Sequence, residues 1–214
     1  MFTMHWPLFG LRVDTPRLML RYPDDDDAVV IAELAGEGVH DPGWMPFSIP
    51  WTDVAPPLLQ RNSLQHIWRT RASWTTDDWH LPMAVIVDGH IVGVQALTAE
   101  QFPVLRTVAT GSWLGRRYQG KGIGTEMRAA ILHFAFAGLG AEYGASRAFA
   151  DNEPSIGVSR RLGYEEVGRH LMVRRDEPAW MIDFRVTRAQ WEEHRRDDID
   201  IVGLEACGDL FGTR

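Results

Sequence analysis

The feature that most constrains the fold is a glycine-rich segment that separates a predicted strand from a predicted helix. Four of the ten positions from 115 to 124 are glycine. The preceding residues, 107–114, predict a strand, whereas residues 122–138 repeat Met127, Ile131 and Phe134 at helical spacing. A helix N-terminus supplies backbone N–H donors with a partial positive charge, and glycine lets the backbone approach a ligand closely. The segment therefore predicts a site for a diphosphate group.

Charged residues inside this segment agree with an anionic ligand. The chain is acidic overall, with a formal net charge of −7 at pH 7. Arg116, Arg117 and Lys121 nevertheless fall within six consecutive positions of the segment. Positive charge that is concentrated in this way suits a small polyanion.

Two other phosphate-binding motifs fit the segment poorly. A nucleotide P-loop requires Ser or Thr directly after Gly-Lys, but here Gly120-Lys121 is followed by Gly122. A dinucleotide-binding unit requires the glycines directly after its first strand, with an acidic residue about 20 positions later at the end of the next strand. The segment instead follows the fourth predicted strand, and Glu142, which has the required spacing, precedes the next one.

The composition is that of a globular domain. The 214 residues are 45% hydrophobic, and the longest apolar run, 129–137, is interrupted by His133 and is far below the roughly 20 residues of a membrane span. A single cysteine, Cys207, excludes a disulfide framework and a multi-cysteine zinc site. Residues 1–11 lack the pattern of a secretory signal. We expect a cytoplasmic protein that binds no metal and has no membrane partner. Because the chain is acidic and shows no basic stripe, we expect no nucleic acid partner either.

The rest of the chain alternates strand-like and helix-like segments around this centre. The pair Asp88-Gly89 predicts a tight hairpin, and Thr187 with Gln190 forms a capping box at a helix start. Residues 39–51 combine prolines with large apolar side chains, which predicts a structured loop. We expect further strands at 12–22, 81–87, 91–97, 145–150, 164–174 and 179–186, and further helices at 25–35, 56–73 and 151–162, whereas residues after 196 receive no assignment.

Three motifs in this order resemble the GNAT superfamily of N-acyltransferases, in particular its branch of ribosomal-protein N-terminal acetyltransferases. The motifs are GSWLGRRYQGKGIGTEMRAAILHFAF, DNEPSIGVSRRLGY and TPRLMLRYP, and the resemblance covers residues 11–191. It implies an α/β (α+β) fold with a mixed, mostly antiparallel central sheet of about seven strands, flanked by helices and splayed at the central parallel pair. It also implies an acyltransferase domain at 1–196 and a C-terminal tail at 197–214.

The resemblance implies acetyl-coenzyme A as co-substrate, with another acyl-coenzyme A such as succinyl-coenzyme A as the alternative. Backbone amides around residues 119–125 would hold the pyrophosphate, and the strand at 111–114 would pair with the pantetheine arm, as an added strand would. The implied coenzyme-binding residues are Trp113, Leu114, Arg117, Gln119, Gly120, Lys121, Gly122, Ile123, Gly124, Thr125, Asn152 and Ser155. Asn152 is equally well explained as a helix cap.

Catalysis is expected to proceed by direct attack of an amine on the thioester, because an acyl-cysteine route needs an activated thiol and Cys207 lies in an acidic tail that gives no such context. Family resemblance implies that Ser155, or second Ser159, protonates the departing thiolate and that the Leu114 N–H stabilises the oxyanion. Many family members carry tyrosine at the position of Ser159. The general base is left open among Glu100, His40 and Asp41.

The acceptor is expected to be a primary amine on a protein N-terminus, a lysine or a small molecule. Its pocket would be lined by loop residues, with two further tryptophans as additional candidates: His40, Trp44, Phe47, Trp51, Trp68 and Trp74. Of these, Trp68 is expected to serve mainly in core packing. Arginines 61, 69 and 71 leave an anionic acyl group such as succinyl open. A non-catalytic coenzyme A binding module is a further alternative, and a homodimer is expected from the hydrophobic tail and the final hairpin.

Overall fold

One mixed sheet organises the molecule, and its strands are linked mainly by antiparallel pairs. The computed structural model describes residues 2–213. The nine strands follow the order β7-β8-β6-β5-β4-β3-β2-β1-β9, and only β5 and β6 pair in parallel. Their bounds are β1 (Arg12–Asp14), β2 (Met19–Arg21), β3 (Trp79–Val87), β4 (His90–Ala99), β5 (Thr107–Leu114), β6 (Tyr143–Phe149), β7 (Glu165–Arg174), β8 (Glu177–Thr187) and β9 (Asp200–Val202).

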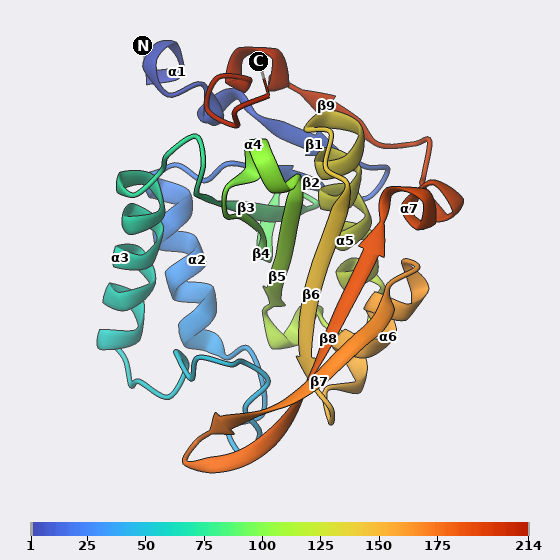
Figure 1. The fold of residues 1–214 in the computed structure, drawn as a ribbon. Coiled ribbons are helices and arrows are strands. Elements are labelled where there is room, and N and C mark those ends of the chain that lie inside the picture. Colours follow the sequence, from blue (N-terminus) through green and yellow to red (C-terminus); the bar gives the residue numbers. More distant parts are fainter. Residues whose placement is uncertain (1, 214) are drawn as a thin grey trace.

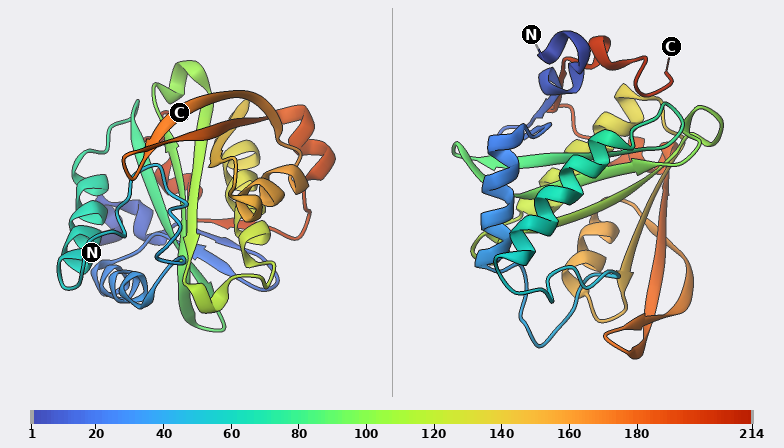
Figure 2. Two further views of the ribbon diagram at one scale, coloured as in Figure 1. Left: turned by 90° about the horizontal axis from the view of Figure 1, so that it is seen from below. Right: turned by 90° about the vertical axis from the view of Figure 1, so that its left-hand side faces the viewer.

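Helices cover both faces of this sheet (Figures 1 and 2). On one face α2 (Asp25–Glu37) and α3 (Leu58–Ala72) pack against each other and on β3 and β4. On the other face lie α5 (Ile123–His133), which continues as a π-helical turn (Phe134–Gly138), and α6 (Glu153–Arg161). Shorter helices are α1 (Phe2–His5), α4 (Phe102–Leu105) and α7 (Arg188–His194). None of the helices formed by residues 2–213 is long and apolar enough to cross a membrane.

The single strand predicted at 12–22 is wrong, because the segment forms the hairpin β1–β2. Thr15 and Leu18 close its turn through a backbone bond of 2.9 Å from the Thr15 N–H to the Leu18 carbonyl. The Thr15 hydroxyl also accepts from the Leu18 N–H at 3.2 Å. Pro16 has no N–H to offer a neighbouring strand, which interrupts the ladder at this point.

The C-terminal segment, which received no assignment from the sequence, adds the ninth strand. β9 pairs antiparallel with β1, with Val13 opposite Ile201. Farther on, Phe211 is fully buried and its ring lies 5.1 Å from Trp79 and 5.4 Å from Trp74. The segment thus completes both the sheet and the core below it.

The predicted centre of the fold is confirmed. The strand at Thr107–Leu114 has the predicted bounds, and a helix begins after the glycine-rich segment. The Asp88-Gly89 hairpin and the Thr187 capping box are also present. About seven strands were predicted and nine are formed, because the first strand is divided and the tail adds one.

Candidate functional site

A fork between β5 and β6 forms the centre of the site. The two parallel strands pair only from Thr107 opposite Tyr143 to Ala109 opposite Ala145. Beyond Ala109 the strands diverge toward the end of β5, as Figure 1 shows. In residues 110–114, one edge of the β5 backbone pairs with β4, whereas the edge toward β6 has no partner strand among the described residues. Such an edge can accept an extended chain as an additional strand.

The glycine-rich segment lies directly after the open end of β5. After a short 3₁₀ turn (Arg116–Tyr118), Gly120 and Gly122 adopt φ angles of 72° and 79°, in the left-handed region that favours glycine. Gly122 is the N-cap of α5 and supplies no side-chain cap to the first N–H groups of the helix. These donors at Ile123, Gly124 and Thr125 are consequently oriented toward the fork with the positive end of the helix dipole.

The arginines of this segment are engaged by acidic side chains of the opposite layer. Arg117 pairs with Glu37 at the end of α2, and Arg116 lies 3.8 Å from Asp41. The ammonium group of Lys121 lies 5.8 Å from the centre of the Tyr118 ring. A further cation, which the sequence did not single out, is Arg17 from the β1–β2 turn, whose guanidinium donates to the Lys121 carbonyl at 3.4 Å. Arg17 is itself paired with Glu126 of α5 at 2.5 Å, so each of these three arginines has an acidic partner.

The Gln119 side chain acts as a tie between three segments. Its amide nitrogen donates to the Val39 carbonyl at 2.6 Å and to the Leu114 carbonyl at 2.9 Å. Its backbone N–H donates to Arg116 at 3.3 Å. Gln119 therefore fixes the loop against the end of β5, and the N–H donors for a ligand lie farther along the segment.

The two serines of α6 occupy different environments. Asn152 caps the helix, because its side-chain oxygen accepts from the Ser155 N–H at 3.2 Å. Ser155 is half-buried in the first turn. Ser159 is fully buried, and among the described residues its hydroxyl has no hydrogen-bond partner. Ser155 is thus partly accessible at the start of α6, whereas Ser159 is directed into the interior.

Buried polar side chains fill the base of the fork, and the sequence did not identify them. The Thr110 hydroxyl donates to the Ala145 carbonyl of β6 at 3.2 Å and lies 3.3 Å from the Tyr164 hydroxyl. Arg128 of α5 reaches the same place and contacts Ser112 and Ser146. Burial raises the pKa of the Tyr164 hydroxyl, so this group is a hydrogen-bond donor at neutral pH.

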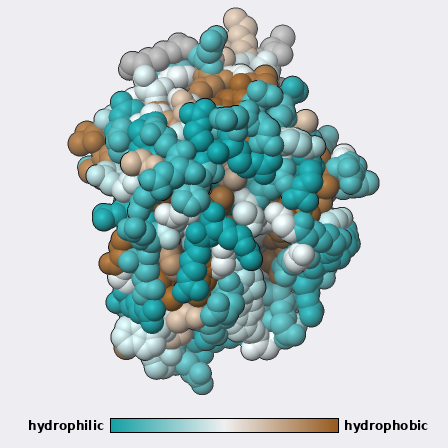
Figure 3. Space-filling view, turned by 90° about the vertical axis from the view of Figure 1, so that its right-hand side faces the viewer, coloured by the Kyte–Doolittle hydropathy of each residue, from teal (hydrophilic) through white to brown (hydrophobic). Residues whose placement is uncertain are grey.

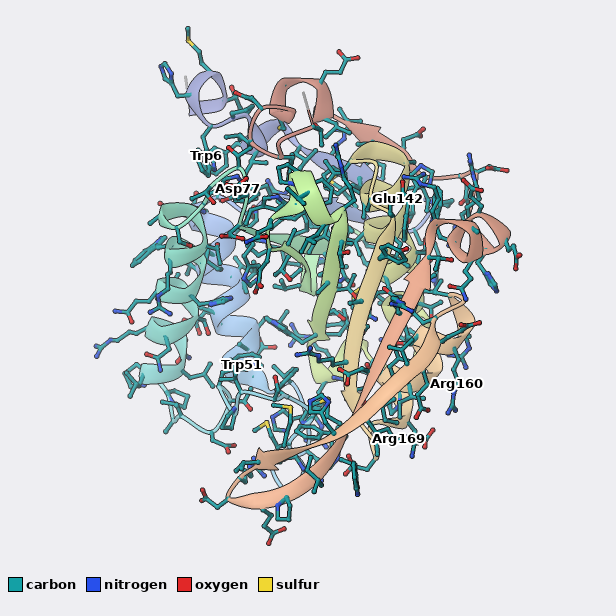
Figure 4. The ribbon with its side chains drawn as sticks, viewed as in Figure 1. Trp6, Trp51, Asp77, Glu142, Arg160 and Arg169 are labelled. Carbon is teal, nitrogen blue, oxygen red and sulfur yellow. The ribbon has the colours of Figure 1, made fainter. Side chains whose placement is uncertain are left out.

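Aromatic residues of the predicted loop cover the α2 and α3 face of β5. The rings of Phe47 and Trp51 lie 5.3 Å apart, and Trp51 lies 5.7 Å from Trp113 of β5. In Figure 4, Trp51 is on the side of α2 and α3, whereas Arg160 and Arg169 lie on the side of α6 and β7. The loop aromatics therefore pack against the strand that forms one arm of the fork.

His40 lies beside this cluster and has a partner for each ring nitrogen. Nδ1 lies 2.7 Å from the Asp41 carbonyl oxygen, which can only accept, so we assign the proton to Nδ1. Nε2 then accepts from the Thr52 hydroxyl at 2.6 Å. Glu100, by contrast, is exposed after β4, beside the beginning of β5 and at the opposite end of that strand from the glycines. The structure does not bring Glu100 and His40 together.

The tip of the β7–β8 hairpin lies beside the loop that follows α2 (Figure 2), and side-chain contacts hold the two together. Arg174 donates to Asp151 at 2.7 Å, and Trp44 donates to the same carboxylate at 3.0 Å. Arg175 forms an ion pair of 2.5 Å with Asp53. The Arg174 hydrogen bond holds the pKa of Asp151 below its ordinary value, so the carboxylate is ionised at neutral pH. Three segments far apart in the sequence thus meet beside the start of α6.

Two other aromatic candidates lie away from this cluster. Trp68 is not a core residue, because it is half-exposed on α3 and donates to Asp25 at 3.2 Å. Trp74 stacks on Trp79 at 5.9 Å in the core near the C-terminal segment. The outer face that carries α6 and α7 is mainly hydrophilic with scattered apolar areas (Figure 3). Among residues 2–213 no group of three or more His, Cys, Asp or Glu side chains could hold a metal ion.

Comparison with known proteins agrees with this geometry. Residues 17–165 match the family model described as an acetyltransferase (GNAT) domain. The fold is similar to that of RimL, a ribosomal L7/L12 alpha-N-protein acetyltransferase solved in complex with coenzyme A, with 17% identity, 81% of this chain and 95% of that chain covered, and a TM-score of 0.66. It is also similar to Mycobacterium smegmatis RimJ in complex with a coenzyme A disulfide. The two chains are 20% identical, the match covers 92% of this chain and 91% of RimJ, and the TM-score is 0.67. A GNAT-family acetyltransferase from Bacillus anthracis has a similar fold, with 15% identity and a TM-score of 0.66. The match covers 83% of this chain and 99% of that protein.

Proposed function

The chain belongs to the GNAT acetyltransferase family, a family of acyl-coenzyme A dependent N-acyltransferases, and on that premise we propose that it transfers an acetyl group from acetyl-coenzyme A to a primary amine in a ternary complex. The observation that carries the proposal is the adjacency of two features. The open edge of β5 ends where the uncapped N-terminus of α5 begins. One ligand that joins an amide-containing arm to a diphosphate satisfies both features at once.

The pyrophosphate would be held by the first N–H groups of α5 at Gly122 to Thr125. Gly122 has its φ angle at 79°, and a Cβ built there would lie 3.4 Å from an Arg17 nitrogen. A side chain at this position would therefore occupy the space between the helix terminus and a nearby cation. Within residues 2–213 Lys121 forms no ion pair, so it can offset the phosphate charge directly, whereas Arg17 would have to share its charge with Glu126 of α5, which lies 2.5 Å away.

The pantetheine arm would pair with the open edge of β5. The arm is about as long as four extended peptide units, or roughly 13 Å. Counted back from Gly115 at about 3.3 Å per residue, this length corresponds to about four residues and brings the thioester close to Gly111, the neighbour of Ser112. We therefore expect Leu114 to lie along the arm, and the oxyanion to receive its hydrogen bond from the β5 backbone nearer Ser112 than Leu114.

The reaction would be a direct attack of the neutral amine on the thioester carbon. Cys207 does not favour an acyl-enzyme, because it is fully buried in the C-terminal segment with its thiol 3.4 Å from the Gly203 carbonyl. Ser155 is the first candidate to protonate the departing thiolate, since Ser159 is enclosed in the interior. Among the base candidates, Glu100 lies at the wrong end of β5 for this geometry, which leaves His40, Asp41 or water.

Acetyl is the preferred acyl group over succinyl. The arginines of α3 were the reason to consider an anionic acyl group, but Arg71 is bound to Asp25 and to the Pro23 carbonyl at 2.8 Å. Arg61 and Arg69 are exposed on the same helix. A succinyl donor is retained as the alternative and is included in the experiment below.

The acceptor would enter beside the aromatic cluster of the loop, with Trp44, Phe47, Trp51 and His40 around it. Similarity to proteins named for acetylation of ribosomal proteins favours a protein N-terminal amine over lysine or a small amine. A cytoplasmic location agrees with this acceptor and with a single cysteine.

A homodimer through the β7–β8 hairpin is part of the proposal. β7 is an edge strand, and Leu171, Val173 and Trp180 are each more than half exposed on this hairpin. Such an edge favours pairing with a second copy. Phe211 in the tail is buried in the same chain, so the hairpin is the better candidate. Sedimentation of the parent protein and of Leu171→Lys tests this point, because a monomeric parent would contradict it.

A turnover assay tests the proposed function. The protein is incubated with acetyl-coenzyme A or succinyl-coenzyme A and with ribosomal-protein peptides, polyamines or lysine peptides, and free thiol release is measured. We expect acetyl-coenzyme A to be used with an N-terminal amine. Faster release from succinyl-coenzyme A would reverse the acyl preference, whereas binding of the donors without release under any acceptor would favour a coenzyme A binding module.

A further inference from the structure

Arg128 is the most deeply buried cation of the described chain that lies close to the proposed site. Its side chain leaves α5 and is only 4% exposed. One guanidinium nitrogen donates to the Ser146 hydroxyl of β6 at 3.0 Å, and another donates to the Ser112 hydroxyl of β5 at 3.3 Å. The guanidinium also interacts with the Tyr164 hydroxyl. Arg128 therefore bridges the two arms of the fork.

The partners of Arg128 are neutral. Within residues 2–213 no acidic side chain forms an ion pair with it, and its Nε has no hydrogen-bond partner. Burial lowers the pKa of this guanidinium, yet an arginine stays charged in proteins. A buried charge is normally paired, because the interior solvates it poorly. The base of the fork thus holds a positive charge, a free N–H donor and no anion of its own.

This charge lies where the proposed function puts the reacting sulfur. Ser112, which Arg128 contacts, is adjacent to Gly111, the β5 residue that the length of the pantetheine arm reaches. Ser146 is the first β6 residue beyond the last paired residue, Ala145. The inference that follows rests on the proposed function, because it requires the thioester to enter the fork.

We propose that the Arg128 guanidinium stabilises the coenzyme A thiolate as it leaves. The amine nitrogen forms a bond to the thioester carbon, the carbon–sulfur bond breaks, and its electron pair goes to sulfur. The proton lost by the amine passes to the general base, which is His40, Asp41 or water. The resulting thiolate is held by Arg128 until it takes a proton from solvent, either directly or through the Ser155 hydroxyl, which gives its proton to sulfur as it receives one from water. Arg128 is thus a catalytic residue in contact with the leaving group.

The charges of the substrate and of the leaving group explain why neutral partners suit Arg128 in this role. The thioester of the bound substrate carries no charge, so Arg128 gains an anionic partner only as the carbon–sulfur bond breaks. An interaction that is stronger in the transition state than in the ground state accelerates the reaction. The fixed hydroxyls of Ser112 and Ser146 orient the guanidinium before that moment.

The ultraviolet absorbance of the thiolate tests the proposal on the parent protein. Coenzyme A is bound to the protein and titrated with base, and its thiol pKa is compared with that of free coenzyme A. We expect the bound thiol to have a pKa lower by about one to three units, as for a group beside an opposite charge. An unchanged thiol pKa in a complex that calorimetry shows to be formed would overturn the proposal.

The variant Arg128→Met supplies the second readout, with Arg128→Lys as the charge-retaining control. We expect Arg128→Met to lose the shift of the thiol pKa and to lower kcat about 100-fold or more, with donor affinity near that of the parent. Arg128→Lys should retain part of both. If Arg128→Met does not fold, the lysine variant and the parent titration still decide the outcome.

The two failures are distinguishable. If the parent protein does not bind coenzyme A, the proposed function is contradicted. Normal binding with full turnover in Arg128→Met would contradict only the role of Arg128. If Arg128→Met loses succinyl-coenzyme A turnover while acetyl-coenzyme A turnover is unchanged, Arg128 binds an acyl carboxylate and the thiolate assignment is wrong.

Discussion

The two sides of β5 are built by different means. On the side of α5, the proposed donor site consists of main-chain groups: an open strand edge, two glycines in the left-handed region and the first turn of one helix. On the side of α2 and α3, the proposed acceptor region consists of long side chains from the 39–57 loop and the β7–β8 hairpin, joined by ion pairs such as Arg175 with Asp53. The first depends on backbone conformation, and the second depends on contacts between distant segments.

This difference predicts how each side responds to change. Main-chain donors cannot be removed by exchanging one side chain, but they can be blocked by adding one. Exposed ion pairs can be removed singly at a small cost, because solvent screens them and their side chains lose entropy when fixed. Substitutions in the donor site should therefore have large effects on coenzyme binding, whereas those in the acceptor region should have graded effects on the acceptor.

The largest effect is expected from Gly122→Glu. A carboxylate at the first turn of α5 would occupy the diphosphate position and repel it, so coenzyme A affinity should fall at least about a thousand-fold, or roughly 4 kcal/mol. Calorimetric titration measures this. Gly140→Glu is the matched control, because Gly140 has a similar φ angle of 73° and open space around it. Equal affinities of the two variants would contradict the donor site.

A pH effect should follow from His80, which packs edge-on against His66 of α3 at a ring distance of 5.1 Å. Burial lowers the pKa of His80 from 6.5 to about 4. Between pH 6.5 and pH 4, His80 is protonated in the unfolded chain but neutral in the folded chain. The free energy of unfolding therefore falls as the pH drops from 6.5 toward 4. The loss should reach roughly 3 kcal/mol.

Urea unfolding of the parent and of His80→Asn at pH 7 and pH 4.5 isolates this contribution, because other titrating groups are common to both proteins. Hydrogen exchange should show the loosening in α3 before α5. A parent and a variant with the same pH dependence would rule out His80 as the cause.

A moderate effect is expected from Ser155→Ala. Loss of a hydroxyl that protonates the thiolate should slow turnover about ten-fold, or 1.4 kcal/mol, while donor affinity stays near normal. Ser159→Ala is the comparison, because removal of a buried hydroxyl without a partner should leave turnover and stability almost unchanged. The reverse pattern in steady-state kinetics would assign the proton donor to Ser159.

The smallest effect is expected from Asp53→Asn. Loss of the ion pair with Arg175 should free the loop from the hairpin and raise the KM for the acceptor a few-fold, within about 1 kcal/mol, with no change for acetyl-coenzyme A. Glu166→Gln, which removes the exposed pair with Arg169 near the beginning of β7, serves as the control. A larger effect on the donor than on the acceptor would mean that the two sides are not separate.

The same contrast explains what the sequence could predict. The strand at Thr107–Leu114, the helix that begins at Ile123 and the capping box at Thr187 depend on local spacing, and all three are confirmed. The β1–β2 hairpin was missed because Pro16 stands in an alternating pattern that otherwise suits one strand. β9 was missed because three residues that pair with the first strand leave no periodic signal.

At the site, the glycines of the segment were identifiable because their pattern is local. The roles of Gln119 and Trp44 in tying segments together were not, since their partners lie about 80 and 107 positions away along the chain. Arg128 carried one signal that could have been used: it is a charged residue among the apolar positions of α5, which predicts an unusual buried cation. Its contacts with Ser112 and Ser146 depend on the tertiary fold.

The pairing of β9 with β1 has a consequence for the order of assembly. β9 (Asp200–Val202) follows β1 (Arg12–Asp14) by most of the described chain, so the exposed edge of β1 must wait until β9 has been made. Until then that edge is open to association with other nascent chains. The labelled ends N and C both lie on the side of the sheet away from the β7–β8 hairpin tip (Figure 1). A purification tag at either end of this chain would therefore leave the fork unobstructed.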